Sequence, residues 1–110
     1  MIERRRHPRV KVSQQALYFS DIYSRPMAAT TVDLSVGGTR IETQYSLIVG
    51  ERLEIFIAIR PHVIKCRGQV VHALDLPGKT PKAGVRFEGL SKRDRLYLEK
   101  YVSRVMKQEG

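Results

Sequence analysis

The sequence has no tryptophan, a single cysteine and only 7% aromatic residues. One cysteine forms no disulfide within the chain and supplies no zinc cluster, so a reducing compartment such as the cytoplasm is expected. The longest purely apolar run spans residues 55–59, far short of the roughly 20 residues that cross a bilayer. No apolar stretch follows the basic start, so we expect neither a transmembrane helix nor an export signal.

Acidic residues are also scarce. The 110 residues include 20 Lys and Arg but only 11 Asp and Glu, which gives a net charge of +9. Residues 1–12 carry five basic residues against one acidic, 13–90 carry nine against seven, and 91–110 carry six against three. We call residues 1–12 the N-terminal arm and expect it to be flexible. Such an arm indicates an anionic partner (a phosphate, nucleic acid or lipid head group) or a solvated start that aids solubility.

The middle of the chain has the pattern of β-strands. Six short apolar or alternating segments follow one another at roughly ten-residue intervals, with turn residues between them. Because no helical segment separates them, neighbouring strands should pair antiparallel. The pattern predicts one sandwich or barrel domain over residues 13–90, with Gly68 marking a bulge or a barrel corner. The expected strands are 17–22, 30–34, 39–43, 52–59, 63–71 and 83–87.

The end of the chain changes to helical periodicity. Ser91 is a favourable N-cap, and Asp94 suits the first turn of a helix. An apolar stripe then recurs at helical spacing, formed by Tyr97, Leu98, Tyr101, Val102 and Val105. The sequence predicts a helix within residues 91–107 that packs one face on the barrel, although a helix lying on a membrane surface has the same pattern.

Nothing in the sequence calls for catalysis or for a metal. His7, His62 and His72 lie in the arm, in a turn and at a strand end, outside any zinc motif, nucleophile elbow or phosphate-binding loop. The carboxylates are scattered, and several alternate with apolar residues as solvent-facing strand positions do. We therefore expect a binding module and no enzyme.

One candidate binding element lies in the arm. Pro8 favours an extended backbone, in which Arg5 and Arg9 point to the same side about 13 Å apart. Two guanidinium groups at this spacing can bind phosphate oxygens or the O6/N7 edge of guanine. An ordinary charged arm would show the same pair.

The second candidate is the segment from Asp33 to Gly38, which joins two expected strands. A plain hairpin accounts for it if Asp33 and Ser35 bond the local backbone and the glycines adopt positive φ. Alternatively, the segment presents a carboxylate, a hydroxyl and backbone amides on a barrel rim. Asp33 would then accept the N1 and N2 hydrogens of a guanine, while Ser35 and the amides of Gly37 and Gly38 would face a phosphate.

Together these elements, Arg-x-x-x-Arg and then Asp-x-Ser-x-x-Gly, resemble the signature of the PilZ domain family. The matching residues are Arg5, Arg9, Asp33, Ser35 and Gly38, and the segment Gly84-Val85-Arg86-Phe87 and Ser91 also look like the family. The resemblance covers essentially the whole chain and is that of a stand-alone PilZ protein. It implies a six-stranded antiparallel β-barrel with a C-terminal helix that binds the bacterial second messenger cyclic di-GMP.

The resemblance also implies roles for single residues. Arg5 and Arg9 would clamp guanine edges and phosphates, and Arg4 or Arg6 would add charge. Asp33 would read a guanine or orient an arginine. His72 stands where many binders carry a bulky side chain against a guanine, although a rim histidine without ligand contact fits equally. The expected ligand-binding set is Arg4, Arg5, Arg6, Arg9, Asp33, Ser35, Gly37, Gly38 and His72.

Ligand binding would rearrange the arm and thereby expose or cover a surface for a downstream protein partner. Two alternatives stay open at this point. One is a small basic barrel that binds single-stranded nucleic acid, which the scarcity of aromatic stacking platforms disfavours. The other is an interaction adaptor that has the fold but senses no ligand.

Overall fold

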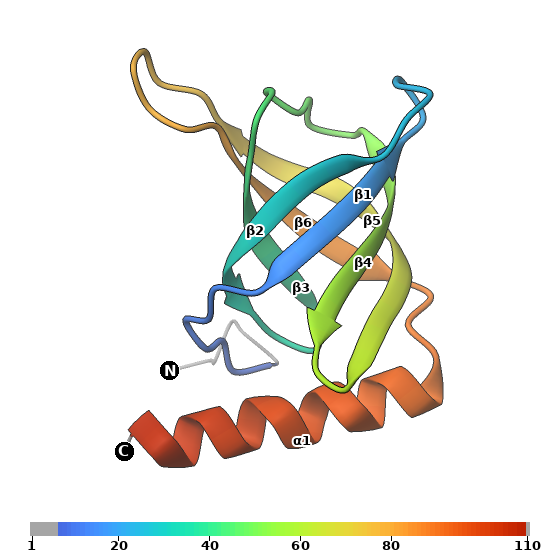
Figure 1. Ribbon diagram of the computed structural model, residues 1–110, viewed down its shortest axis with the longest axis vertical. Helices are drawn as coiled ribbons and strands as arrows, with labels where there is room; N and C mark the ends of the chain where they lie inside the picture. The colour runs from blue at the N-terminus through green and yellow to red at the C-terminus, as the bar shows by residue number, and fades with distance from the viewer. Residues whose placement is uncertain (1–6, 110) are drawn as a thin grey trace, which may run out of the picture.

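A computed structural model describes residues 7–109 and shows a closed barrel with one helix across its end (Figure 1). The elements are β1 (Gln15–Ser20), β2 (Met27–Leu34), β3 (Gly38–Thr43), β4 (Arg52–Ile59), β5 (His62–Leu74), β6 (Lys82–Glu88) and α1 (Lys92–Glu109). Around the barrel the strand order is β1-β2-β3-β6-β5-β4, and every neighbouring pair is antiparallel. The expected fold, a six-stranded antiparallel β-barrel with a C-terminal helix, is confirmed.

Alternation along the strands builds the core. In β4, every second side chain from Leu53 to Ile59 is buried inside the barrel, whereas Phe56 and Ala58 on the outer face are only half-buried. Burying one such Leu or Ile side chain stabilises the fold by about 1.5–3 kcal/mol. The two-residue period of the sequence therefore determines which face of each strand is internal.

The bulge expected at Gly68 is wrong. Gly68 pairs in register with both neighbouring strands, and a Cβ there would lie 2.5 Å from Cγ1 of Val85. The glycine is thus required by close packing against Val85 inside the barrel. Irregular register occurs elsewhere, between Thr31 and Asp33 and between Val70 and His72.

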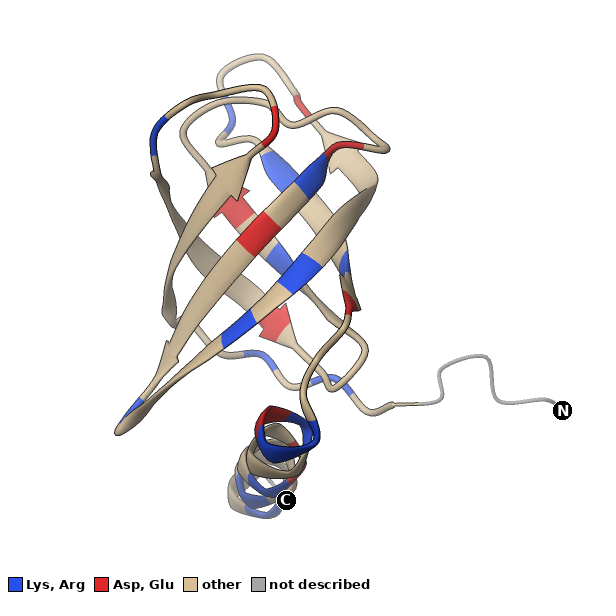
Figure 2. Ribbon diagram, turned by 90° about the vertical axis from the view of Figure 1, so that its right-hand side faces the viewer, with Lys and Arg blue, Asp and Glu red and all other residues tan. Residues whose placement is uncertain are grey.

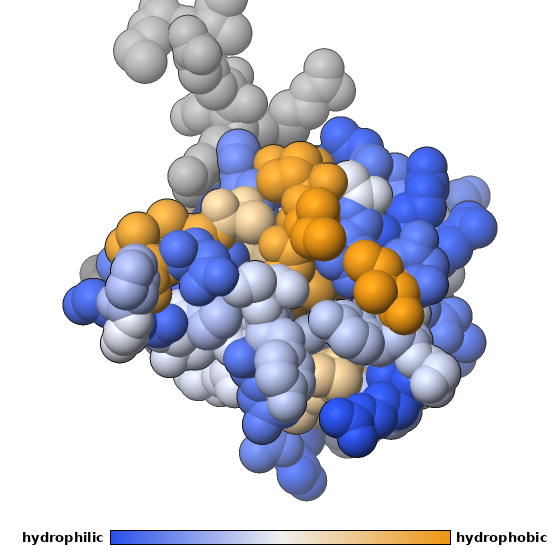
Figure 3. Space-filling view, turned by 90° about the horizontal axis from the view of Figure 1, so that it is seen from above, coloured by the Kyte–Doolittle hydropathy of each residue, from blue (hydrophilic) through white to orange (hydrophobic). Residues whose placement is uncertain are grey.

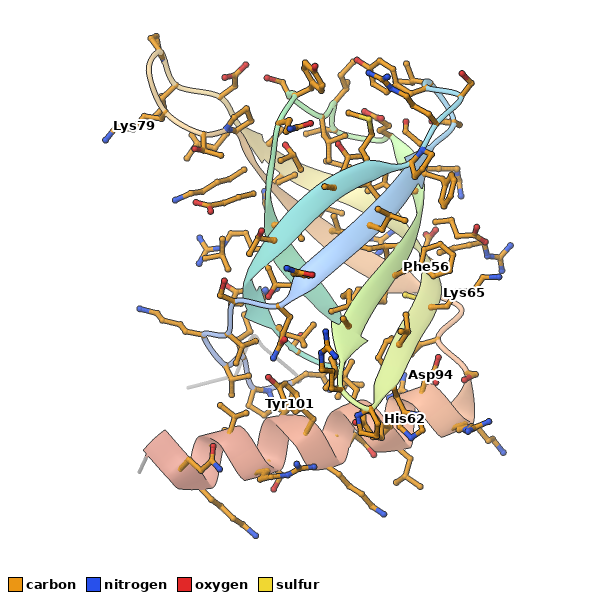
Figure 4. The ribbon with its side chains drawn as sticks, in the orientation of Figure 1. Phe56, His62, Lys65, Lys79, Asp94 and Tyr101 are labelled. Carbon is orange, nitrogen blue, oxygen red and sulfur yellow. The ribbon has the colours of Figure 1, made fainter. Side chains whose placement is uncertain are left out.

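Helix α1 closes one end of the barrel through the expected stripe. Leu98 and Val102 are buried, and Tyr101 points toward the barrel (Figure 4), where its hydroxyl accepts a 2.8 Å hydrogen bond from the side chain of Gln14. The backbone N–H of Asp94 donates to Oγ of Ser91 at 3.1 Å, which confirms the N-cap. The stripe is therefore a core contact. Across the residues described, no helix is both long and apolar enough to span a bilayer.

The second half of the N-terminal arm is docked on the barrel. Val10 is 1% exposed and exchanges backbone hydrogen bonds of 3.0 and 2.9 Å with Leu34. Thr31 then donates its hydroxyl to the carbonyl of Val12. The packed structure thus begins before residue 13, because the apolar side chain of Val10 in the basic arm is buried in the core. Residues 1–6, with Arg4, Arg5 and Arg6, lie outside the described residues.

The end of the barrel opposite α1 is formed by the β1–β2, β3–β4 and β5–β6 loops. Apolar side chains are scattered over this end among polar ones (Figure 3). The exposed large ones in these loops and at the strand end beside them are Ile22, Tyr23, Tyr45, Ile48, Val49, Leu74 and Leu76. The two ends of the barrel therefore differ, since α1 covers only one of them (Figure 1).

Candidate functional site

A groove of about 700 Å³ runs over the outside of the barrel next to the docked part of the arm. One wall comes from Arg9, Asp33, Gly37 and Arg40, and the other comes from residues 71–74 of β5 and residues 82–86 of β6. Small-molecule sites typically measure about 300–1,000 Å³. The structure thus brings four of the expected ligand residues, Arg9, Asp33, Gly37 and His72, to one groove of suitable size.

Asp33 is the electrostatic centre of this groove. It is 4% exposed, and its Oδ1 accepts hydrogen bonds from Nη1 of Arg9 at 2.8 Å and from the backbone N–H of Arg40 at 3.2 Å. Its Oδ2 accepts a bidentate pair from Nε and Nη2 of Arg40, at 3.1 and 2.9 Å. Of the two roles expected for Asp33, the geometry therefore favours orienting arginines over reading a guanine directly.

Both irregularities of strand register adjoin the groove. Between Thr31 and Asp33 the pairing of β2 with β3 shifts by one residue, after which Asp33 stands opposite Arg40. The pairing of β5 with β6 shifts in the same way between Val70 and His72. Bulges re-aim side chains and are frequent near functional sites. Here each one precedes an expected ligand residue.

Ser35 closes the loop between β2 and β3. It is 3% exposed, and its Oγ accepts hydrogen bonds from the backbone N–H groups of Gly37 and Gly38 at 3.1 and 3.2 Å. The hydroxyl and the two amides that were expected to face a phosphate thus bond to one another. This is the local arrangement of a serine-closed turn, so Ser35 shapes the rim without lining the groove.

The two glycines of this loop do not have the positive φ expected for them, which occurs only at other glycines in the described residues. A Cβ on Gly38 would lie 2.3 Å from the carbonyl oxygen of Val85, so glycine is required where β3 approaches β6. A Cβ on Gly37 would instead meet the ring of His7 at 3.0 Å. Of these two glycines, only Gly37 lines the groove.

His72 lies on the opposite wall of the groove. It is exposed, and its ring lies over Gly84, where an added Cβ would be 3.4 Å from the imidazole. No side-chain hydrogen bond holds it among the described residues. An exposed ring at this position is compatible with both alternatives stated for His72, stacking on a base or a rim histidine without ligand contact.

Arg40 and Arg86 are not among the ligand-binding residues expected from the sequence. Both line the groove, and Arg86 donates from Nη2 to Oε1 of Gln69 at 2.8 Å. Alternation in the segment 39–43 places Arg40 on the outer face, but its position opposite Asp33 follows from the shifted register of β2 with β3. The groove therefore holds three guanidinium groups, and those of Arg9 and Arg40 share the buried carboxylate of Asp33. Guanidinium groups arranged in this way bind anions and base edges.

A second hollow, of about 620 Å³, lies elsewhere on the barrel and contains none of the expected residues. Its lining includes Arg52 and Glu88, which form an ion pair at 3.6 Å. Its charges are thus partly balanced within the barrel. The groove beside Asp33 is the better candidate site.

Solved structures with this fold include cyclic di-GMP complexes. "PilZ domain with c-di-GMP of YcgR" from Escherichia coli matches with a TM-score of 0.78 at 18% identity, covering 97% of this chain and 95% of that one. The "K. pneumonia MrkH-c-di-GMP complex" matches with 0.79 at 16% identity, covering 98% and 54%. The Bacillus subtilis "Inhibitor of motility (MotI/DgrA)" matches with 0.87 at 18%, covering 97% and 53%.

The chain thus spans about half the length of MotI/DgrA and of MrkH. At these identities the likeness establishes the barrel fold. A comparison with curated proteins gives no match. The family comparison is decisive, since the model of the PilZ domain matches residues 3–104. The chain belongs to the PilZ domain family.

Proposed function

We propose that the groove binds cyclic di-GMP and that the chain acts as a receptor for this nucleotide, not as an enzyme. The observation that carries the proposal is the pair of arginines, Arg9 and Arg40, held by the buried carboxylate of Asp33 at a groove of about 700 Å³. Membership of the PilZ family supports it, as do the cyclic di-GMP complexes of YcgR and MrkH.

The two arginines are suited to a ligand that combines guanines with phosphates. Each guanidinium has five N–H donors, and Asp33 uses only one from Arg9 and two from Arg40. The other donors can reach phosphate oxygens or the O6/N7 edge of guanine. Because Asp33 already fixes both side chains, binding costs less side-chain entropy than it would with mobile arginines.

The remaining expected residues take different parts in this proposal. Gly37 lets the ligand approach bare backbone, and His72 stacks on a base from the opposite wall. Ser35 and Gly38 hold the shape of the rim. Arg5 completes the clamp from the segment before Pro8, with charge added by Arg4 and Arg6.

Signalling would use the segment that precedes Val10. Two backbone hydrogen bonds fix Val10 to β2, so a rearrangement on ligand binding is confined to the residues before it. We propose that this segment settles over the bound nucleotide in the cytoplasm and changes the surface offered to a protein partner. Hydrogen exchange tests this: the amide of Val10 is protected without ligand, and amides 4–7 gain protection when cyclic di-GMP is added. Unchanged exchange there, despite ligand binding, would contradict the signalling step alone.

Calorimetric titration with cyclic di-GMP tests the receptor assignment. Arg9→Ala removes one clamp and should weaken binding by roughly 10- to 100-fold, since a hydrogen bond to a charged group contributes about 1.5–3 kcal/mol. Arg25→Ala, in the β1–β2 loop away from the groove, is the matched control and should bind like the wild type. Equal affinity of the wild type and Arg9→Ala would show that Arg9 is no clamp.

Two further titrations separate the receptor from its alternatives. Cyclic di-AMP should bind more weakly by about 1–3 kcal/mol for each guanine edge that is read, because adenine has a donor where guanine has O6. The affinity for cyclic di-GMP should fall only gently with salt, whereas a single-stranded nucleic acid that covers many phosphates gives a steep slope. If neither dinucleotide binds, the remaining alternative is an interaction adaptor that has the fold but senses no ligand.

A further inference from the structure

The side of α1 that faces away from the barrel is basic. In a helix of 3.6 residues per turn, the buried side of α1 is centred near Leu98 and Val102, and the opposite side is centred near Leu96. Around Leu96 lie five exposed cations, which we call the basic face: Lys92, Arg93, Lys100, Arg104 and Lys107. Glu99 is the one exposed acidic residue described within this face.

The cations of the basic face have no acidic partners among the described residues. Six cations of the arm and barrel do form ion pairs: Arg9, Arg40, Arg52, Lys65, Lys82 and Arg86. Asp94 is turned toward the barrel, where its carboxylate accepts from the backbone N–H of Lys65 at 3.4 Å (Figure 4). The positive charge of α1 is therefore not compensated in the folded chain.

This charge pattern also disfavours the helix itself. Lys100 and Arg104 are four residues apart, and Arg104 and Lys107 are three apart, so like charges are neighbours on the helix surface. Such pairs destabilise a helix, whereas opposite charges at the same spacing stabilise it. A run of unbalanced cations on a packed helix points to a partner outside the chain.

The basic face is both long and accessible. From Lys92 to Lys107 it extends roughly 22 Å at 1.5 Å per residue. Among the described elements, α1 forms the outermost layer at its end of the barrel, with its basic positions spread along it (Figures 1 and 2). A flat surface can therefore contact the full length of the face without meeting the strands. Leu96, 53% exposed, lies in the middle of it.

We propose that the basic face binds the surface of a membrane that contains anionic phospholipids, with α1 parallel to the bilayer plane. Each Lys or Arg close to such a surface strengthens binding roughly fivefold, and Leu96 adds an apolar contact at the level of the head groups. The apolar stripe of α1 stays packed on the barrel, so the attachment is electrostatic and reversible.

Nucleic acid fits this face less well. Base edges are read by arginine, amide and hydroxyl groups. The basic face offers Arg93 and Arg104, but only Ser103 and Gln108 are uncharged and polar among the solvent-facing side chains of α1. The ammonium groups of Lys92, Lys100 and Lys107 act as point charges. A planar array of lipid phosphates meets all of them at once, whereas the curved backbone of a duplex meets few.

Co-sedimentation with vesicles tests the proposal. The probes are vesicles of phosphatidylcholine alone and of phosphatidylcholine with one third phosphatidylglycerol. Lys100→Glu/Lys107→Glu is compared with Arg25→Glu/Lys79→Glu, whose side chains lie in the loops at the opposite end of the barrel; Lys79 is labelled in Figure 4. Each double substitution changes the net charge by −4, from +9 to +5, so the two variants differ only in where the charge is lost.

We expect the wild type to bind the anionic vesicles and not the neutral ones. The helix variant should lose at least about 30-fold in affinity, because two attractions of about 1 kcal/mol each are removed, and the loop variant should stay within about threefold of the wild type. Circular dichroism checks the fold, and Lys100→Gln/Lys107→Gln gives a second, milder variant. Equal losses in both double variants would overturn the proposal, as would absence of binding to anionic vesicles. Binding to duplex DNA in place of vesicles would assign the face to nucleic acid.

Discussion

The groove and the basic face of α1 are both cationic, but their charges are held differently. In the groove, Arg9 and Arg40 share one buried carboxylate, at 2.8 and 2.9 Å. On α1, none of the five cations has an ion pair among the described residues. Fixed guanidinium groups suit a small ligand of defined shape, because their orientation is set before binding. Mobile cations suit a broad surface on which charges can rearrange.

The two regions also differ in what supports them. The rim of the groove depends on backbone contacts, in which Gly38 approaches Val85 and the hydroxyl of Ser35 closes the loop. The basic face consists only of side chains that extend into solvent from a helix packed by its other side. Substitutions near the groove should therefore lower stability, and substitutions on the basic face should not.

Gly38→Ala should have the largest effect on stability. The added Cβ would lie 2.3 Å from the carbonyl oxygen of Val85, and relief requires β3 to move away from β6. We expect the free energy of unfolding to fall by about 3 kcal/mol, at the upper end for overpacking, which urea denaturation measures.

Gly37→Ala is the matched control for this substitution. Its Cβ meets only the His7 ring, at 3.0 Å, and a side chain can turn aside, so a loss of about 0.5 kcal/mol is expected. Since Gly37 lines the groove, the same variant should weaken cyclic di-GMP binding while remaining folded. Similar losses of stability in both variants would show that backbone packing does not distinguish the two glycines.

Asp33→Ala should have the next largest effect. It removes the acceptor of Arg9 and Arg40 and leaves two cations side by side. The free energy of unfolding should fall by about 2 kcal/mol, a value reduced because both arginines are partly exposed to solvent. Cyclic di-GMP affinity should fall as well, since the arginines lose their orientation.

Asp21→Ala, an exposed carboxylate in the β1–β2 loop, removes the same charge away from the groove and should change neither quantity. Urea denaturation and calorimetry on the same samples separate stability from binding. Full cyclic di-GMP affinity in folded Asp33→Ala would mean that the arginines need no carboxylate to bind the ligand.

The fold could be predicted because its signals are local. Two-residue alternation, as in the segment 52–59, and the turn residues between strands specify the barrel strands. The stripe around Leu98 specifies which side of α1 is buried. Each signal depends on spacing along the chain. The contacts of Gly68 could not be predicted in this way, because its neighbour Val85 comes from another strand.

The candidate site could be predicted only in part. Four residues of the expected ligand-binding set, Arg9, Asp33, Gly37 and His72, line one groove. Arg40 was missed, because its place opposite Asp33 depends on the register of β2 with β3, a tertiary property that one sequence does not reveal. For Ser35 the sequence left two alternatives open, and its hydroxyl takes the local one, since it bonds the backbone of its own loop.

The docked half of the arm shows the same limit. Composition predicts that residues 1–12 form a flexible charged arm. The second half of this arm is docked instead, because the side chain of Val10 is buried in the core beside Leu34. A single apolar residue in a basic segment gives no periodic signal. Its burial follows from the shape of the barrel and not from local pattern.

Lys100→Glu should have the smallest effect on stability, and in the opposite direction. Position 100 is four residues before Arg104, so the substitution replaces a repulsion with the favourable Glu-to-Arg order along a helix. A gain of about 0.3–0.5 kcal/mol is expected, and Lys100→Gln, which only removes the repulsion, should gain less. High salt should reduce the gain because the pair is exposed. Urea denaturation at two salt concentrations measures both effects.

A loss of stability in Lys100→Glu would mean that Lys100 has a partner within the folded chain. If the gain in stability comes with weaker binding to anionic vesicles, the basic face of α1 is maintained for a partner and not for the fold.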